Sequence, residues 1–339
     1  MSDLYITSKN FSFNKEEVRT LASVKYWAVK SSSRLSTLPN RQSLRNIFRD
    51  TSDVVDESNY RQLKSEWCEE WKRMTCELLE LGKLTDEDEL PAKLKALDLS
   101  STKSAAFGVE AATWEPFHEL KKEEKRYQKL RVDASDFANY CKYISHLPEL
   151  KAQSTLTGMR DAYQACITRI VKTINGSNYT WIWVGAGALA LLLAAPYAAT
   201  MVGGMMSLSG AAATSAGLAF LGGGSLAAGG MGMAGGYVVL MAGGAILGYG
   251  AGSKQQRDKF AETSKEEILI NCAKLYAMQG YLDISINEVC KNVQAMQIDL
   301  DALADQLYCE GNTKEGEKQS SKSIVLSTYR RIARGEIQV

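Results

Sequence analysis

The sequence matches the fingerprint of a dinucleotide-binding loop twice, at Gly185-x-Gly187-x-x-Ala190 and at Gly230-x-Gly232-x-x-Gly235. Such a loop needs a βαβ unit around it and an acidic residue about 20 positions later, which holds the ribose. At that spacing the chain carries Met205 and Gly250, and no acidic residue lies nearby. Both matches are attributed to chance in a glycine-rich stretch, and no nucleotide cofactor is expected.

Other motifs that serve catalysis are incomplete. A phosphate-binding loop of the Gly-Lys-Ser/Thr type needs a lysine, which this glycine-rich stretch lacks. Residues 223–227, Gly-Gly-Ser-Leu-Ala, approach the sharp turn that presents a nucleophilic serine, but the final glycine is missing. The acidic run 86–89 lies on an expected connector and is interpreted as solvated charge. No constellation of residues supports an enzyme.

Histidine and cysteine do not form the clusters that a metal site needs. The two histidines, His118 and His146, are 28 residues apart on what is predicted to be one helix. The cysteines are scattered singly, which argues against a disulfide framework and a structural zinc site. We expect most of them to be reduced, half-buried helix residues. They are Cys68, Cys76, Cys141, Cys166, Cys272, Cys290 and Cys309.

The charge balance argues against a nucleic-acid partner. The chain has 40 Lys and Arg against 39 Asp and Glu, a formal charge of +1, and no basic block. The first residues lack a basic region followed by an apolar run, so no secretory signal is predicted and synthesis in the cytosol is expected.

One long segment carries no charge at all. Residues 173–253 are 81 consecutive positions without Asp, Glu, Lys, Arg or His, and they hold 20 of the chain's 27 glycines. A soluble helix or strand must show some face to water, so this length without a charge is unusual. We call residues 173–253 the charge-free segment.

The charge-free segment is long enough to cross a membrane. A spanning helix needs about 20 mainly apolar residues, which 179–204 supplies. Aromatic residues that favour the headgroup level lie near its two ends: Tyr179, Trp181, Trp183 and Tyr249. Basic residues flank the segment on both sides, which places both ends in the cytoplasm and requires an even number of crossings. A helical hairpin with its tip within 203–215 is predicted.

Small residues recur at every fourth position in the second half of the segment. On a helix such positions form one ridge, and in lipid a ridge of small residues lets two helices pack closely. With Leu240 as the exception, the ridge is Gly224, Ala228, Gly232, Gly236, Gly244, Gly248 and Gly252. Two alternatives remain, a flexible linker and a hairpin buried in a soluble core. The apolar fillers disfavour the linker, because flexible linkers are rich in Ser, Pro or charge.

The chain on either side of this segment is predicted to be helical. Apolar residues alternate steps of three and four over 57–82, 116–146 and 149–174, which places one stripe along each helix. Gly82 is expected to close the first helix. Shorter helices are predicted at 14–30, where Asn14-x-x-Glu17 can cap, and at 322–334. Residues 31–56, 84–112 and 311–321 are predicted to be polar connectors.

The strongest periodic signal follows the charge-free segment. Heptad spacing from Ile268 to Leu307 predicts one helix of about 45 residues, roughly 65 Å long. Ser264-x-x-Glu267 is expected to cap it, and Gly280 is the expected point of a kink. Its stripe is interpreted as the packing face of a bundle or an oligomer, and includes Leu275, Leu282, Val289, Val293, Met296, Leu300 and Leu303.

Since no β-rich run is present, we predict an all-α fold: an elongated, coiled-coil-like helical bundle with a glycine-rich, transmembrane-competent hairpin. Five regions are expected. They are a helical region with polar connectors (1–112), long amphipathic helices (113–175), the glycine-rich membrane hairpin (176–253), a long heptad helix (254–310), and a polar linker with a short helix (311–339).

Long amphipathic helices on both sides of a central apolar hairpin resemble the α-helical pore-forming toxins of the haemolysin E type. The resemblance concerns the layout of about 116–310, and no family motif is matched residue by residue. It implies that the hairpin is sheltered in a soluble form and enters the membrane as subunits assemble.

Three functions are therefore considered. The first is an oligomerising, membrane-inserting effector that forms a pore or disrupts the bilayer, with lipid and further copies of the chain as partners. The second is a constitutive membrane-anchored scaffold whose cytosolic helices bind a partner protein. The third keeps the hairpin buried in a soluble helical bundle. No metal or cofactor is expected in any of them.

Overall fold

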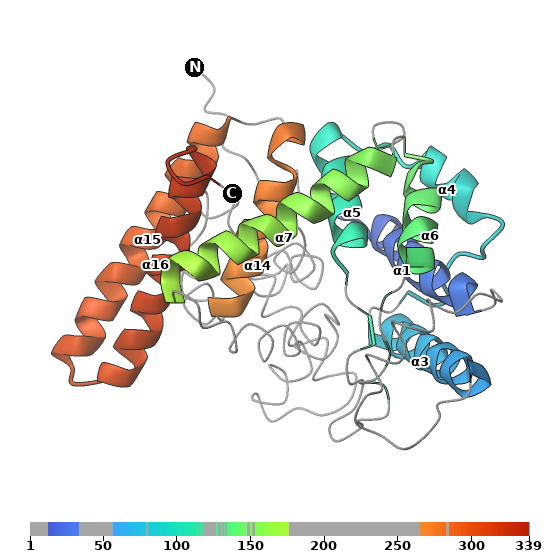
Figure 1. The fold of residues 1–339 in the computed structure, drawn as a ribbon, viewed down its shortest axis with the longest axis horizontal. Helices are drawn as coiled ribbons and strands as arrows, with labels where there is room; N and C mark the ends of the chain where they lie inside the picture. Colours follow the sequence, from blue (N-terminus) through green and yellow to red (C-terminus); the bar gives the residue numbers. More distant parts are fainter. Residues whose placement is uncertain are drawn as a thin grey trace, which may run out of the picture. The chain divides into compact units, whose positions relative to one another are not determined.

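The computed structural model describes residues 13–33, 57–78, 81–114, 116, 117, 127, 130, 132, 134–147, 150, 153–175, 265–282 and 285–338 (Figure 1). These ranges are mainly helical and contain no strand, so the predicted all-α class is confirmed for them. The predicted hairpin, its glycine ridge and its aromatic residues lie outside the described residues.

The chain divides into two compact units, each described by itself. The first, which we call the α1 unit, consists of Asn14–Asp98 and Ala111–Leu156. The second, the α16 unit, consists of Met1–Phe13, Leu99–Glu110 and Thr157–Val339. Each unit therefore combines segments that are distant in the sequence.

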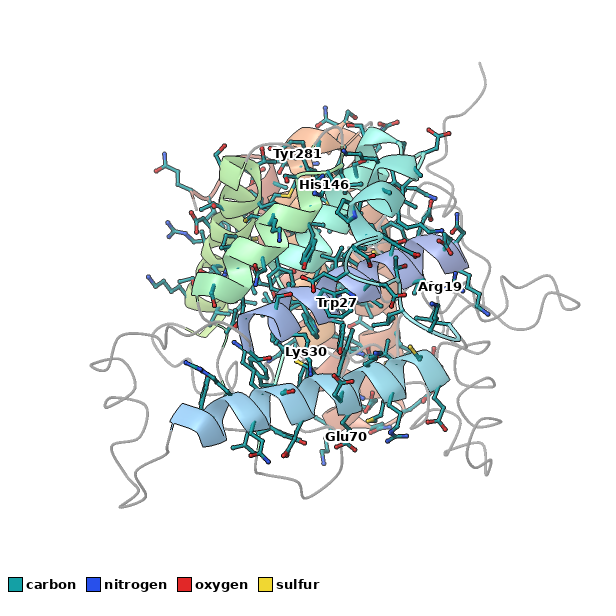
Figure 2. The ribbon with its side chains drawn as sticks, turned by 90° about the vertical axis from the view of Figure 1, so that its right-hand side faces the viewer. Arg19, Trp27, Lys30, Glu70, His146 and Tyr281 are labelled. Carbon is teal, nitrogen blue, oxygen red and sulfur yellow. The ribbon has the colours of Figure 1, made fainter. Side chains whose placement is uncertain are left out.

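Helix α1 is the centre of the α1 unit, where it contacts the other three helices. These helices are α1 (Lys15–Ser33), α3 (Glu57–Leu78), α4 (Leu90–Ala96) and α6 (Ala134–Ile144). Because neighbours surround α1, it buries apolar residues on more than one face, including Val18, Leu21, Val24 and Val29. Figure 2 shows α1 lying along α3.

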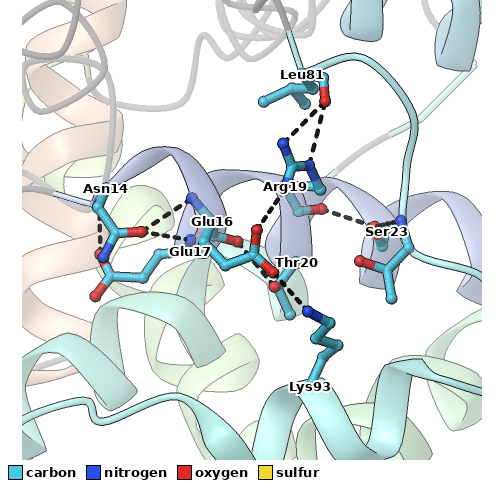
Figure 3. A network of polar contacts seen from close by, with 9 residues as sticks. Asn14, Glu16, Glu17, Arg19, Thr20, Ser23, Leu81 and Lys93 are labelled. Atoms are coloured by element: carbon cyan, nitrogen blue, oxygen red, sulfur yellow. Dashed lines mark hydrogen bonds and ion pairs between the residues drawn. The ribbon is translucent and has the colours of Figure 1, made fainter.

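Polar side chains attach the loop after α3 to α1. The Arg19 guanidinium donates to the Leu81 carbonyl over 3.0 Å and 3.2 Å (Figure 3). The indole of Trp27 donates to the Thr85 carbonyl at 2.9 Å, and the Thr85 amide donates to Ser23 Oγ at 2.9 Å. These bonds satisfy backbone groups that would otherwise be unpaired in the interior.

The predicted cap of α1 is confirmed. Asn14 Oδ1 accepts hydrogen bonds from the amides of Glu16 and Glu17, both at 2.9 Å, and Glu17 Oε2 accepts from the Asn14 amide at 2.7 Å. This reciprocal pattern satisfies donors that a helix start leaves without partners. Figure 3 shows it at one end of α1.

The α16 unit contains an antiparallel hairpin of α15 and α16, against which α14 packs. Its elements are most of α5 (Ser101–Ala112), most of α7 (Gln153–Asn175), α14 (Lys265–Ala277), the short helix η4 (Gln279–Tyr281), α15 (Ile286–Cys309) and α16 (Thr313–Ala333). Gly311 turns the chain between α15 and α16 with a φ of 79°. A residue with a side chain would be strained in this conformation, whereas glycine adopts it freely. At the same end, the Tyr308 ring lies against Gly316, where an added Cβ would come within 2.8 Å of it.

The prediction of a single helix of about 45 residues from Ile268 is wrong. The structure has α14 and α15, separated by η4 and an extended Leu282. Ser285 then caps α15 in a capping box with Glu288, and this cap starts a new helix within the heptad pattern. The helix ends near Gly280, where only a kink was expected. The proposed cap at Ser264 lies outside the described residues.

The prediction of a continuous helix over 116–146 is also wrong. Residues 116, 117, 127, 130 and 132 are not helical, and α6 begins only at Ala134. Phe117 has a φ of 73°, which is incompatible with a right-handed helix. His146 lies in the turn after α6, and His118 lies outside the described residues.

The polar connectors predicted at 84–112 and 311–321 contain helices instead. The first range holds α4, with proline in its first turn, and α5, whose apolar residues 105–107 and 109 are buried. In the second range α16 begins at Thr313, and its first turns are polar because most of their side chains face water. The expected connector at 31–56 begins later than predicted, because α1 continues to Ser33, and residues 34–56 lie outside the described residues.

Two other predicted helices are confirmed. The helix predicted at 149–174 is α7, and its stripe of Leu156, Met159, Tyr163, Cys166 and Ile170 is buried. The helix predicted at 57–82 is α3, which ends at Leu78, and Gly82 follows with a φ of 73°.

Replacing Asn14 by Ala is expected to lower the free energy of unfolding by about 1 kcal/mol, because two amides of α1 lose their acceptor. Asn14→Ser is the matched control, since serine also caps and should stay close to the wild type. Urea unfolding followed by circular dichroism measures both. Equal stability of Asn14→Ala and Asn14→Ser would contradict the capping role.

Candidate functional site

The predicted packing stripe is part of the interior of the α16 unit. Val289, Val293, Met296 and Leu300 of α15 are buried, and so is Leu275 of α14. Leu282 and Leu303 are half-buried. Because α15 packs along α16 of the same chain, the stripe serves as a bundle face within one molecule.

The two helices that flank the charge-free segment both belong to the α16 unit. Helix α7 ends at Asn175, and α14 begins at Lys265. Figure 1 shows these two ends at the same end of the unit. The last turns of α7 bury Ile170 and Val171, and the first turns of α14 bury Ile268 and Leu269. The described chain is therefore well packed on both sides of the segment.

Four helices of this unit meet around the side chain of Tyr329. Burial raises its pKa well above the usual value, and so do nearby ionisable groups of α7, α14 and α15. These groups are Cys166, Cys272, Cys290 and Tyr276. The hydroxyl of Tyr329 is buried and has no hydrogen-bond partner among the described residues. A hydroxyl in this state neither titrates near neutral pH nor meets solvent, so it is not a catalytic acid.

A buried ion pair connects α5 to α14. Lys274 Nζ lies 2.7 Å from Glu110 Oε1, and the two side chains are only 1% and 2% exposed. Removing one partner of such a pair leaves an uncompensated charge in the interior. The pair therefore fixes the helix that follows the charge-free segment against a helix that precedes it by more than 60 residues.

The α1 unit contains a second buried ion pair. Lys64 Nζ of α3 lies 2.8 Å and 2.9 Å from the two carboxylate oxygens of Asp136 in α6, and the side chains are 2% and 0% exposed. Ser32 of α1 donates a hydrogen bond to the same carboxylate. This lysine, carboxylate and hydroxyl would suit proton transfer, but all three are buried, so they hold three helices together rather than meet a substrate.

An aromatic cluster packs beside this pair. The rings of Trp67, Trp71 and Trp114 have centroids 4.9 to 6.1 Å apart, and the Phe117 ring lies 5.1 Å from that of Trp67. Lys64 Nζ lies 5.6 Å from the centre of the Phe117 ring. These contacts hold Phe117 in its left-handed backbone conformation, which costs energy for a residue with a side chain.

The interpretation of 86–89 as solvated charge is wrong for Glu87. Its Oε1 accepts hydrogen bonds from Ser31 Oγ at 2.8 Å and from the Tyr143 hydroxyl at 2.6 Å. This half-buried carboxylate joins α1 to α6. The sequence gives no signal for it, because its partners lie 56 residues away in each direction.

The cysteines are free thiols, as predicted, and five of the seven are buried. Burial raises the pKa of Cys68 and Cys166 to about 12 and also raises that of Cys272. A thiol must ionise to act as a nucleophile or to bind metal, so these thiols are unreactive near neutral pH.

The described residues contain no group of three His, Cys, Asp or Glu side chains placed to hold a metal ion. Burial and the nearby Lys95 and Lys142 lower the pKa of His146, which keeps its imidazole neutral near pH 7. Within the same part of the chain, no helix is both long and apolar enough to cross a membrane.

Comparisons with known proteins do not assign a family. No protein-family model, no curated protein and no solved structure matches the chain.

Replacing Glu110 by Gln is expected to lower the free energy of unfolding by about 3–5 kcal/mol, because Lys274 would remain buried without its partner. The matched control is Glu77→Gln, which removes an exposed pair with Arg73 (3.1 Å, 69% and 59% exposed) and should cost less than about 1 kcal/mol. Denaturant unfolding measures both. A small effect of Glu110→Gln, no larger than the control, would contradict the burial of the pair.

Alkylation at pH 8 is expected to modify Cys309 first, since it is the exposed cysteine. With a pKa of about 12, only about one Cys68 or Cys166 thiol in 10,000 is ionised at that pH, and the reagent cannot reach it. Mass spectrometry of alkylated peptides, with and without denaturant, gives the order. Labelling of Cys166 as fast as Cys309 in the folded protein would contradict the packing around Tyr329.

Proposed function

We propose that this protein is a membrane-inserting effector that associates with further copies of itself. The observation that carries the proposal is that the charge-free segment begins in the last turn of α7 and ends before α14, and that both helices belong to one packed unit. In this proposal the charge-free segment enters the bilayer from the cytoplasmic side, while the helical units remain in water.

The physical argument rests on the different demands of water and lipid. In lipid, each unsatisfied backbone group costs several kcal/mol, so an inserted segment folds as helices and satisfies these groups internally. A segment without charges avoids the cost of placing a charged side chain in the membrane, about 2.5–3.5 kcal/mol on insertion scales. The same composition in water leaves a large apolar surface exposed. The segment is therefore better suited to lipid than to solvent.

The helices on either side of the segment are held in place by packing, so the α16 unit can serve as a fixed support for an inserting segment. Helix α14 is held by the buried Lys274–Glu110 pair and by its contacts with α16. Helix α7 contributes Cys166 to the residues around Tyr329. Insertion of the segment can then proceed while the α16 unit stays folded. The glycine ridge from Gly224 to Gly252 would pack against its own or a neighbouring hairpin.

The purified protein is expected to release dye from liposomes, and a variant lacking 179–252 is expected to leave the dye inside. Gly248→Ile is a finer change, because it places a side chain on the ridge where helices are to meet and should reduce release. Gly250→Ile is the matched control, since it adds the same side chain two positions away, off the ridge. Dye fluorescence measures all four proteins.

Retention of dye with the wild-type protein would overturn the effector proposal. Equal loss of release in Gly248→Ile and Gly250→Ile would overturn the role of the ridge. Cell fractionation separates the scaffold alternative, since a scaffold sediments with membranes at all times and is tolerated on expression. An effector is found first in a soluble or restrained form and harms cells on release.

A further inference from the structure

Two large apolar side chains of the α15–α16 hairpin are exposed to solvent. Ile298 of α15 is 58% exposed and Ile324 of α16 is 50% exposed. Among the described residues, the one other exposed large apolar side chain is Tyr308, which is 40% exposed and whose ring already lies against Gly316. Within the described part of the unit, the two isoleucines are the large apolar side chains that packing leaves uncovered.

Both isoleucines lie at the same height along the hairpin. The turn is centred on Gly311, and Ile298 lies 13 residues before it while Ile324 lies 13 residues after it. With 1.5 Å of rise per residue, each lies about 20 Å from the turn. In Figure 1 the two helices run side by side over this length.

Both isoleucines also lie on the same side of the hairpin. Tyr308 and Gly316 mark the line along which the helices meet. At 100° per residue, Ile298 lies about 80° around α15 from Tyr308, and Ile324 lies about 80° around α16 from Gly316, in the same sense of rotation along each chain. Because the helices are antiparallel, these rotations turn both side chains toward one side.

Charged residues flank each isoleucine at heptad spacing. Seven residues before and after Ile298 are Lys291 and Asp305, and both are exposed. Seven residues before and after Ile324 are Glu317 and Arg331, which are also exposed. Read from the amino end, α15 presents positive, apolar and negative side chains, whereas α16 presents negative, apolar and positive ones. Each stripe is complementary to a second copy of itself that runs antiparallel to it.

We propose that this face binds a second copy of the chain. The face consists of Lys291, Ile298, Asp305, Glu317, Ile324 and Arg331. In the dimer a two-fold axis crosses the hairpin at the height of the isoleucines, so each of α15 and α16 lies antiparallel to its own counterpart in the other copy. Lys291 then faces the partner's Asp305, Glu317 faces the partner's Arg331, and each isoleucine faces its own counterpart. Each charged contact occurs twice, as a two-fold interface requires.

The area and chemistry of this face set the strength of the dimer. A face two helices wide and about 30 Å long covers on the order of 600 Å² per copy, below the usual figure of about 800 Å². Four of the six residues are charged and exposed, so salt screens part of the attraction. Arg331 also has Glu336 at 3.9 Å, in a pair that is about half exposed. The dimer is thus of moderate affinity and weakens with salt.

This inference does not depend on membrane insertion. Its residues all belong to the described helices, and the dimer forms in water without lipid. It also differs from the stripe predicted from the heptads, which is covered by α16 within one chain.

The test uses two charge-reversal variants of the full chain, Asp305→Arg and Lys291→Asp. Alone, each variant places like charges opposite each other at both contacts between positions 291 and 305 of a dimer, and is expected to lose self-association by at least tenfold. Mixed in equal amounts, the two variants restore opposite charges at both contacts. Sedimentation velocity without lipid, at about 50 mM salt with one variant carrying a fluorescent label, measures each sample.

The control variant is Gln306→Arg, which adds the same side chain one position away and turned about 100° from the face. It is expected to self-associate like the wild type. The inference is overturned if the wild-type chain is monomeric at 100 μM, if it dimerises and Asp305→Arg does so equally well, or if the mixture associates no better than the separate variants. Association through the charge-free segment would not distinguish the mixture from its components.

Discussion

Each unit of this protein is organised around a lysine and a carboxylate that leave water together. Lys64 and Asp136 join α3 to α6, and Lys274 and Glu110 join α5 to α14. Inside a helical unit neither charge is tolerated without the other, because the interior does not solvate it. Any arrangement of these helices that separates the partners is strongly disfavoured. The pairs thus select which helices meet, a choice that apolar contacts leave open.

The predictability of the helices from sequence depended on local signals. Asn14 with Glu17 gave a cap that formed as expected, and the stripe from Leu156 to Ile170 gave α7. The break between α14 and α15 was missed because apolar residues continue at heptad spacing through it, while Ser285 decides the start of α15. Phe117 was assigned to a helix because its conformation is set by Trp67, which is distant in the sequence.

The interior contacts could be predicted only in part. Composition and spacing indicated that the cysteines are free and mostly buried, and the structure agrees. The partners of Lys64 and Lys274 lie 72 and 164 residues away, and periodicity carries no information about such pairs. The exposed face of the hairpin escaped notice for a related reason. The strong buried stripe of α15 defines the heptads, and Ile298 becomes visible only once α16 is seen to cover the other side.

The order of the elements along the chain has a consequence during synthesis. Helices α14, α15 and α16, which complete the α16 unit, all follow the charge-free segment. At about 5–20 residues per second, the ribosome needs roughly 4–16 s to make the 80 residues from 254 to 333. For these seconds the charge-free segment has been made, and the helices that complete the α16 unit have not. Chaperones, membranes and neighbouring nascent chains therefore meet it before its own domain is complete.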